Sequence, residues 1–157
     1  MASVGGLGVD SVIALARAVQ GIDDATLFAP PGLDALTHAI PRDIISYNET
    51  LPARGRAWVV VHPAGAIDAG DTALFARLPG QNPLSAHYAR TGDGRALRIS
   101  DFVGSGTFHR LELYQAFYRP LGIEHQLAVT IAARRHAVIE IALNRRSAIS
   151  RTLSVAS

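Results

Sequence analysis

Glu140 is the residue whose setting points most directly to chemistry. It lies in an apolar stretch, flanked by Val138, Ile139, Ile141 and Ala142, where an unpaired carboxylate is costly to bury. A carboxyl group in such surroundings can act as a general acid or base with a raised pKa, or it can anchor a polar group of a ligand. Alternatively, Glu140 faces water or forms an ion pair with an arginine. The sequence alone leaves these alternatives open.

A predicted β-hairpin surrounds Glu140, with strands at residues 123–133 and 136–144 joined by Arg134 and Arg135. If these two arginines form a two-residue loop, Val129 faces Glu140 and His125 faces Asn144. One face of the hairpin then combines apolar side chains with an imidazole, a carboxylate and an amide, which is the composition of a ligand pocket. This face consists of His125, Leu127, Val129, Ile131, Val138, Glu140, Ala142 and Asn144. The opposite face, with Gln126, Ala128, Thr130, Ile139, Ile141 and Leu143, is typical of a plain core.

Other chemically capable residues give weaker signals. His109 and Glu112 are three apart on a predicted helix, so they share a face and form either half of a metal site or, more commonly, a surface pair. The six histidines show no metal-ligand spacing. Ser105 has no evident histidine and acid partners for a hydrolase triad. We therefore expect no metal and no cofactor.

The elements that must position these residues are at least five strands with helices mixed between them, ending in an antiparallel hairpin. Apolar spacing, prolines and glycines predict an α+β fold, an antiparallel sheet with helices packed on it. The predicted helices cover residues 11–20, 33–40, 71–78, 84–90 and 107–119, the second of them starting after a break at Pro30 and Pro31. The predicted strands cover residues 43–49, 56–62, 96–100, 123–133 and 136–144.

Composition excludes several classes of function. The chain has 157 residues, no cysteine and a formal net charge of +2, which excludes disulfide scaffolds, cysteine-ligated metals and thiol catalysis. So small a charge is no electrostatic footprint for nucleic acid or an anionic membrane. No apolar run approaches the roughly 18–20 residues of a membrane-spanning helix. We expect a soluble, cytoplasmic protein without nucleic-acid or membrane partners.

The second half of the chain carries a more specific pattern, in the segments His87–Phe102, Phe108–Arg110, Leu113–Tyr114, Phe117–Gly122, Glu124–Leu127 and Ala142–Arg145. Together with Ile45–Glu49, these segments resemble the amino-terminal GAF-like sensor domain of actinobacterial LuxR-type transcription regulators. The resemblance covers most of residues 10–146. It implies a GAF/PAS-like antiparallel sheet of five to six strands, a small-molecule pocket between the sheet and its helices, and homodimerisation.

The resemblance, taken with the predicted hairpin, suggests which residues line the pocket. GAF-like topology would place Tyr47, on the first strand, beside the last strand, with Trp58 one strand further. Buried tyrosine hydroxyls and the indole N–H need partners, which a ligand can supply, although most aromatic residues are simply core. The candidate ligand-binding residues are Tyr47, Trp58, His87, Phe102, Tyr114, Tyr118, His125, Val129, Glu140 and Asn144.

The chain also departs from the family pattern. The family has a long helix and a helix-turn-helix after its last strand, whereas only a short irregular tail, residues 147–157, follows the predicted domain of residues 1–146. We therefore expect a domain truncated before its DNA-binding module, and our hypothesis for the cause is a frameshift. The leading interpretation is a stand-alone domain that binds a small, largely apolar metabolite. The alternative is a small cofactor-free enzyme of secondary metabolism (an isomerase, cyclase or hydrolase) using Glu140 as acid or base, and a third option is an inactive fragment.

Overall fold

The computed structural model describes residues 10, 13–14, 16–17, 20, 25–51, 54, 56–134 and 137–147. The chain divides into two compact units, Met1–Arg42 and Asp43–Ser157. Half of the helix predicted over residues 11–20 lies outside the described residues; of the rest, residues 13, 14, 16 and 17 are helical. Among the described residues, no helix is both long and apolar enough to cross a membrane.

The first unit contains helix α2, Ala25–Ala39, which runs through Pro30 and Pro31 without a break. The prediction that these prolines interrupt the chain was wrong. A proline ring holds φ near the helical value, so the backbone can stay helical although each proline removes one hydrogen bond to the preceding turn. The helix ends before Pro41, as expected.

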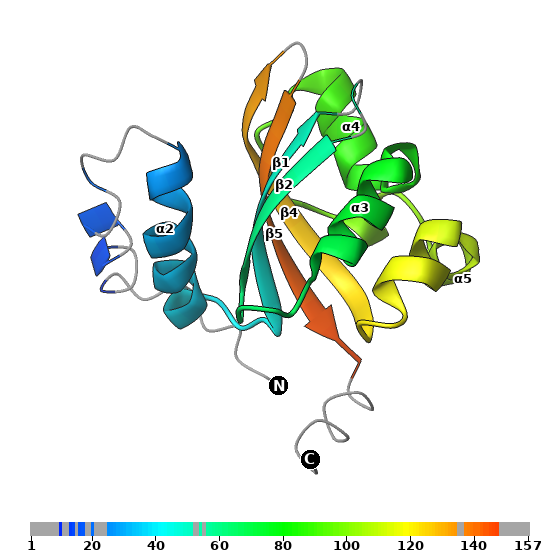
Figure 1. The fold of residues 1–157 in the computed structure, drawn as a ribbon, viewed down its shortest axis with the longest axis horizontal. Coiled ribbons are helices and arrows are strands. Elements are labelled where there is room, and N and C mark those ends of the chain that lie inside the picture. The colour runs from blue at the N-terminus through cyan, green and yellow to red at the C-terminus, as the bar shows by residue number, and fades with distance from the viewer. Residues whose placement is uncertain are drawn as a thin grey trace. The chain divides into compact units, whose positions relative to one another are not determined.

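The second unit is built on a five-stranded antiparallel sheet of order β2-β1-β5-β4-β3 (Figure 1). The predicted α+β class is confirmed, and so is the expected position of the first strand beside the last. Each of the five predicted strands is present, although β3 is short because the chain turns at once into a 3₁₀ helix whose Asp101 accepts a hydrogen bond from the Arg98 amide. The strands are β1 Ile44–Leu51, β2 Arg56–His62, β3 Leu97–Arg98, β4 Ile123–Arg134 and β5 Ala137–Arg146.

Three helices cover one face of this sheet: α3 Ala69–Arg77, α4 Pro83–Thr91 and α5 Ser105–Arg110 (Figure 1). Their limits follow from local sequence. Asp68 caps α3 in a capping box with Asp71, and Asn82 caps α4 through two backbone amides. Gly92 ends α4 at φ 65°, a left-handed conformation that glycine adopts without strain.

The helix predicted over residues 107–119 is two elements, α5 and a π-helical segment, Tyr114–Tyr118. The backbone is extended at Leu111. The amide of Leu113 donates to Gln81 Oε1 at 2.9 Å, outside the helix. A long-range contact therefore overrides the helical pattern of the local sequence.

The register between β4 and β5 differs from the predicted one. Thr130, and not Val129, pairs with Glu140, and Gln126, and not His125, pairs with Asn144. Arg134 already pairs with Ala137, so the connection begins one residue later than predicted, which moves the pairing by two residues. The irregularity between Thr130 and Ala132 takes one of these residues back, so the net shift beyond it is one residue. A shift of one residue moves every side chain of a strand to the other face. Gln126, Ala128 and Thr130 therefore share a face with Glu140.

Candidate functional site

A cavity lies between the helix-covered face of the sheet and the helices above it. The space in which the centre of a water molecule fits has a volume of about 30 Å³. This is enough for two or three waters. Its polar wall comes from alternate residues of β1, β4 and β5, and its apolar wall from β2, α3 and the π-helical segment. The lining residues are Ser46, Asn48, Thr50, Val59, Ile67, Thr72, Phe75, Phe117, Gln126, Glu140 and Asn144.

Glu140 is the acidic residue of this lining and is only 3% exposed. Its Oε1 accepts a hydrogen bond from Ser85 Oγ at 3.3 Å, while its Oε2 has no hydrogen-bond partner among the described residues. Burial raises the pKa of Glu140 to about 7, although the Ser85 hydroxyl opposes the shift. Neither alternative interpretation holds within the described part of the chain, because Glu140 neither faces bulk water nor pairs with an arginine.

A separate network of buried polar side chains lies beside Glu140. Asn82 Nδ2 lies 2.8 Å from Tyr118 Oη and 3.0 Å from Gln126 Oε1, and Tyr118 Oη donates to the same Gln126 oxygen at 3.1 Å. Gln126 Nε2 then donates to Asn144 Oδ1 at 2.9 Å. Burial raises the pKa of Tyr118 far above its ordinary value, with the nearby Glu140 adding to the shift. These four residues satisfy one another, whereas neither oxygen of Glu140 bonds to this network.

The helical side of the cavity is mainly apolar. Phe75 of α3 and Phe117 of the π-helical segment pack edge to face, with ring centroids 5.3 Å apart. Ile67 and Thr72 also line this side, while Val59 lines the cavity from the sheet, beside Asn48. A molecule in the cavity would meet hydrogen-bonding groups on the sheet and aromatic surface on the helices. This combination is typical of a site that orients a small amphipathic ligand.

Of the ten candidate site residues, Glu140 and Asn144 line the cavity. Tyr118 is not a lining residue, but its hydroxyl donates a hydrogen bond to Gln126, which lines the cavity. The predicted grouping of His125 and Val129 with these residues was wrong, because the observed register turns both side chains to the opposite face.

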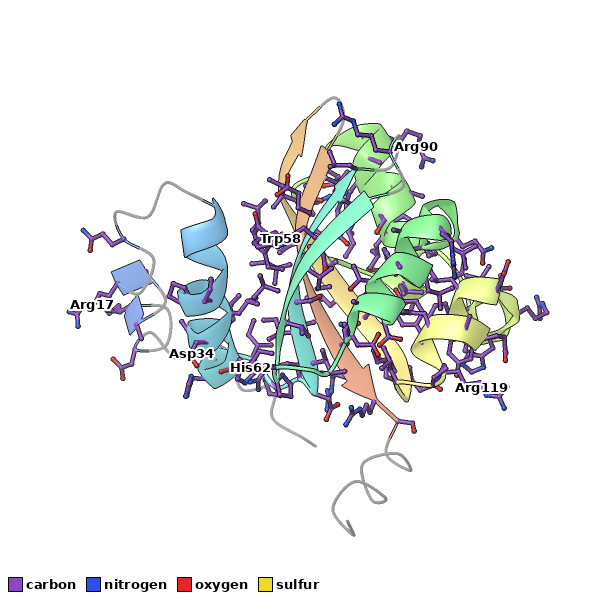
Figure 2. The ribbon with its side chains drawn as sticks, viewed as in Figure 1. Arg17, Asp34, Trp58, His62, Arg90 and Arg119 are labelled. Atoms are coloured by element: carbon purple, nitrogen blue, oxygen red, sulfur yellow. The ribbon has the colours of Figure 1, made fainter. Side chains whose placement is uncertain are left out.

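Tyr47 and Trp58 also lie on the opposite face of the sheet. They pack edge to face with centroids 5.6 Å apart, and Figure 2 shows Trp58 on the side of the sheet away from α3. Tyr47 pairs with Ile141, the residue that follows Glu140 in β5. Alternation along the strand nevertheless points the side chains of Tyr47 and Glu140 to opposite faces of the sheet.

The three remaining candidates belong to two other clusters. His87 packs on Phe102 at 5.0 Å and pairs with Asp93 at 3.0 Å. Tyr114 donates to Glu124 at 2.5 Å. None of the three is a lining residue of the cavity.

His109 pairs with Glu124 at 2.8 Å, so the expected pairing of His109 with Glu112 was wrong. The reason is that α5 ends at Arg110 and Glu112 lies outside it. Among the described residues, no three His, Cys, Asp or Glu side chains are grouped as metal ligands would be.

Several lining residues were missed from the sequence. Gln126 was assigned to plain core because the predicted register placed it on the wrong face. A usable signal existed in β1, where polar side chains recur at every second position, Ser46, Asn48 and Thr50. Such alternation on a strand that is otherwise buried indicates a polar surface facing inward. Phe75, Phe117, Ile67 and Thr72 carry no comparable signal.

Comparison with known proteins identifies solved structures of similar fold. No protein-family model matches the chain, and no curated protein matches it. The crystal structure of the VqsR ligand-binding domain from Pseudomonas aeruginosa is similar, with a TM-score of 0.65 and 14% identity over 92% of this chain and 85% of that one. The N-acylhomoserine lactone-dependent LuxR-family transcription factor CepR2 from Burkholderia cenocepacia is also similar, with a TM-score of 0.52 and 17% identity over 92% of this chain and 84% of that one. At these identities, the likeness shows the fold alone.

Proposed function

We propose that this chain is a small-molecule-binding domain of the kind found in LuxR-type regulators, of the GAF-like type. Its ligand would be a small, largely apolar metabolite that carries a polar group. The observation that carries the proposal is the cavity on the helix-covered face of the sheet, with the buried carboxyl group of Glu140 in its wall. The similarity to two regulator structures supports it at the level of fold.

The energetics of the cavity agree with a binding role. A residue that keeps a buried, half-satisfied carboxyl group lowers the stability of the fold. Such groups persist where they serve binding or catalysis, because a plain core residue would be more stable at that position. The cavity is small, so a metabolite larger than a few heavy atoms requires side chains such as Phe75 and Phe117 to move.

The test uses the purified full chain. A metabolite collection is screened by thermal shift, and native mass spectrometry records any molecule that co-purifies and the number of chains per particle. Asn48→Phe fills the cavity from β1, and Ala89→Phe adds the same side chain at an exposed position of α4. We expect ligands that stabilise the chain and Ala89→Phe but not Asn48→Phe. If no compound binds, or if Asn48→Phe binds equally well, the proposal is wrong. The same spectra test the homodimer that the family resemblance implies.

One observation favours a second candidate function, a cofactor-free enzyme. A carboxyl group whose pKa is raised to about 7 by burial is suited to proton transfer near neutral pH. In a catalytic role, Glu140→Gln would abolish turnover of a bound ligand while leaving a bound complex detectable. In a sensor, the same substitution would change only the affinity for the ligand. The ligand would then be recovered unmodified from the wild-type protein and from Glu140→Gln.

A further inference from the structure

Glu140 lies in the cavity without a cationic partner. Its Oε2 has no hydrogen-bond partner within the described residues, and the described lining contains no arginine or histidine. The titratable groups that act on it electrostatically are the phenols of Tyr88 in α4 and Tyr118 in the π-helical segment, and burial raises the pKa of both, so both are neutral. The side chains that β1, β4 and α3 contribute nearby, Asn48, Thr130 and Thr72, carry no charge.

Two uncharged amide side chains lie on the same sheet face as Glu140. Gln126 and Asn144 satisfy each other through their amide groups at 2.9 Å. An amide at position 140 would accept a hydrogen bond from a neutral ligand without the cost of burying an acid. For binding, a carboxylate gains most over an amide when the incoming group is positively charged, because the two charges then compensate each other's desolvation.

The opposite wall supplies a second, independent feature suited to a cation. The rings of Phe75 and Phe117 line the same cavity. The face of an aromatic ring attracts an ammonium group, and this attraction strengthens where water is excluded. An acid on one wall and two aromatic rings on the other therefore match a small cation that also carries apolar surface.

We propose that the cavity binds a small organic ammonium ion, whose N–H groups donate to Glu140 Oε2 and whose charged head and adjoining alkyl carbons pack against Phe75 and Phe117. The inference rests on the proposed function, since it names the ligand class of the same cavity. No covalent bond changes. Where Glu140 is protonated before binding, its proton passes to solvent as the ammonium ion takes its place, so net charge in the cavity stays balanced.

The experiment compares three probes of equal chain length: n-butylammonium chloride, n-butanol and sodium butyrate. Isothermal titration calorimetry is run on the full chain and on Glu140→Gln, with Glu112→Gln as the matched substitution at an exposed glutamate. Titrations in two buffers of different ionisation enthalpy report the protons released.

We expect n-butylammonium to bind the wild-type chain and Glu112→Gln, and to bind Glu140→Gln about tenfold more weakly or worse, because a hydrogen bond to a charged group is lost. Proton release should accompany binding at about pH 6 and disappear at about pH 8. Binding of n-butanol with equal affinity to the wild type and Glu140→Gln, without ammonium preference, would overturn the inference and leave the proposed binding function intact. Absence of binding by all three probes and by the metabolite collection would overturn both.

Discussion

Replacing Glu140 by glutamine should make the protein more stable at neutral and alkaline pH. The substitution keeps the size of the side chain and an oxygen for the Ser85 hydroxyl, which lies 3.3 Å from Oε1. It removes the group that burial disfavours in its charged form. A residue retained for function, and not for stability, is expected to give a more stable protein when it is replaced in this way.

The magnitude follows from the pKa shift. Folding raises the pKa of Glu140 from 4.5 to about 7, and each unit corresponds to about 1.4 kcal/mol. Between these two values the folded state binds more protons than the unfolded state, so the free energy of unfolding of the wild type falls as pH rises. The loss is complete above about pH 7 and amounts to about 3 kcal/mol. Glu140→Gln lacks this loss, so its advantage is near zero below about pH 4.5 and reaches about 3 kcal/mol at about pH 8.

Urea denaturation, followed by circular dichroism across this pH range, measures the difference directly. Glu112→Gln makes the same substitution at an exposed position, where the free energy of unfolding should change by about 0.5 kcal/mol or less. A difference between wild type and Glu140→Gln that does not vary with pH would refute the reasoning. So would a Glu140→Gln protein that is less stable than the wild type at about pH 8.

Three further outcomes follow from the same structure. Asn82→Ala should lower the free energy of unfolding, measured by urea denaturation, by about 2–4 kcal/mol, because it removes the cap of α4 and the donor to Gln126. Asn82→Ser keeps a capping oxygen and should recover part of the lost stability. Equal losses of stability in the two variants would contradict the capping role. Gly92→Ala should cost about 1 kcal/mol at its left-handed φ of 65°, whereas Gly94→Ala, in open space, should cost less by the same measurement. Calorimetry should show the affinity for n-butylammonium falling about tenfold between about pH 8 and pH 6, since Glu140 must first lose its proton; an affinity independent of pH would exclude Glu140 as the anchor.

Local signals were sufficient for the elements of the sheet. Residues that favour strands, a turn expected from Pro52 to Gly55 and a stop at Pro63 placed β1 and β2 close to their observed limits. Local signals failed where a distant contact decided the structure. The hydrogen bond from the Leu113 amide to Gln81 lies outside any local pattern, and it accompanies the break in the helix predicted over residues 107–119.

The composition of the site was harder to predict than the fold. The sequence marked Glu140 because a carboxyl group among aliphatic residues is unusual at any register. It placed Gln126 in the core and His125 in the pocket because two features of the hairpin leave no local signal. The connection begins one residue later than predicted, which moves the pairing by two residues and leaves the faces unchanged. The irregularity between Thr130 and Ala132 then takes one residue back, and this net shift of one exchanges the two faces of β4.

The sequence by itself determined the α+β class, the strands and an acid in an apolar stretch that needs an explanation, since all three depend on local periodicity and on the cost of desolvating charge. Only the tertiary structure decided which side chains meet that acid. Strand register and the packing of α3 and the π-helical segment over the sheet are set by contacts between residues far apart in the chain, and these contacts place Asn48, Gln126, Phe75 and Phe117 around the same cavity as Glu140.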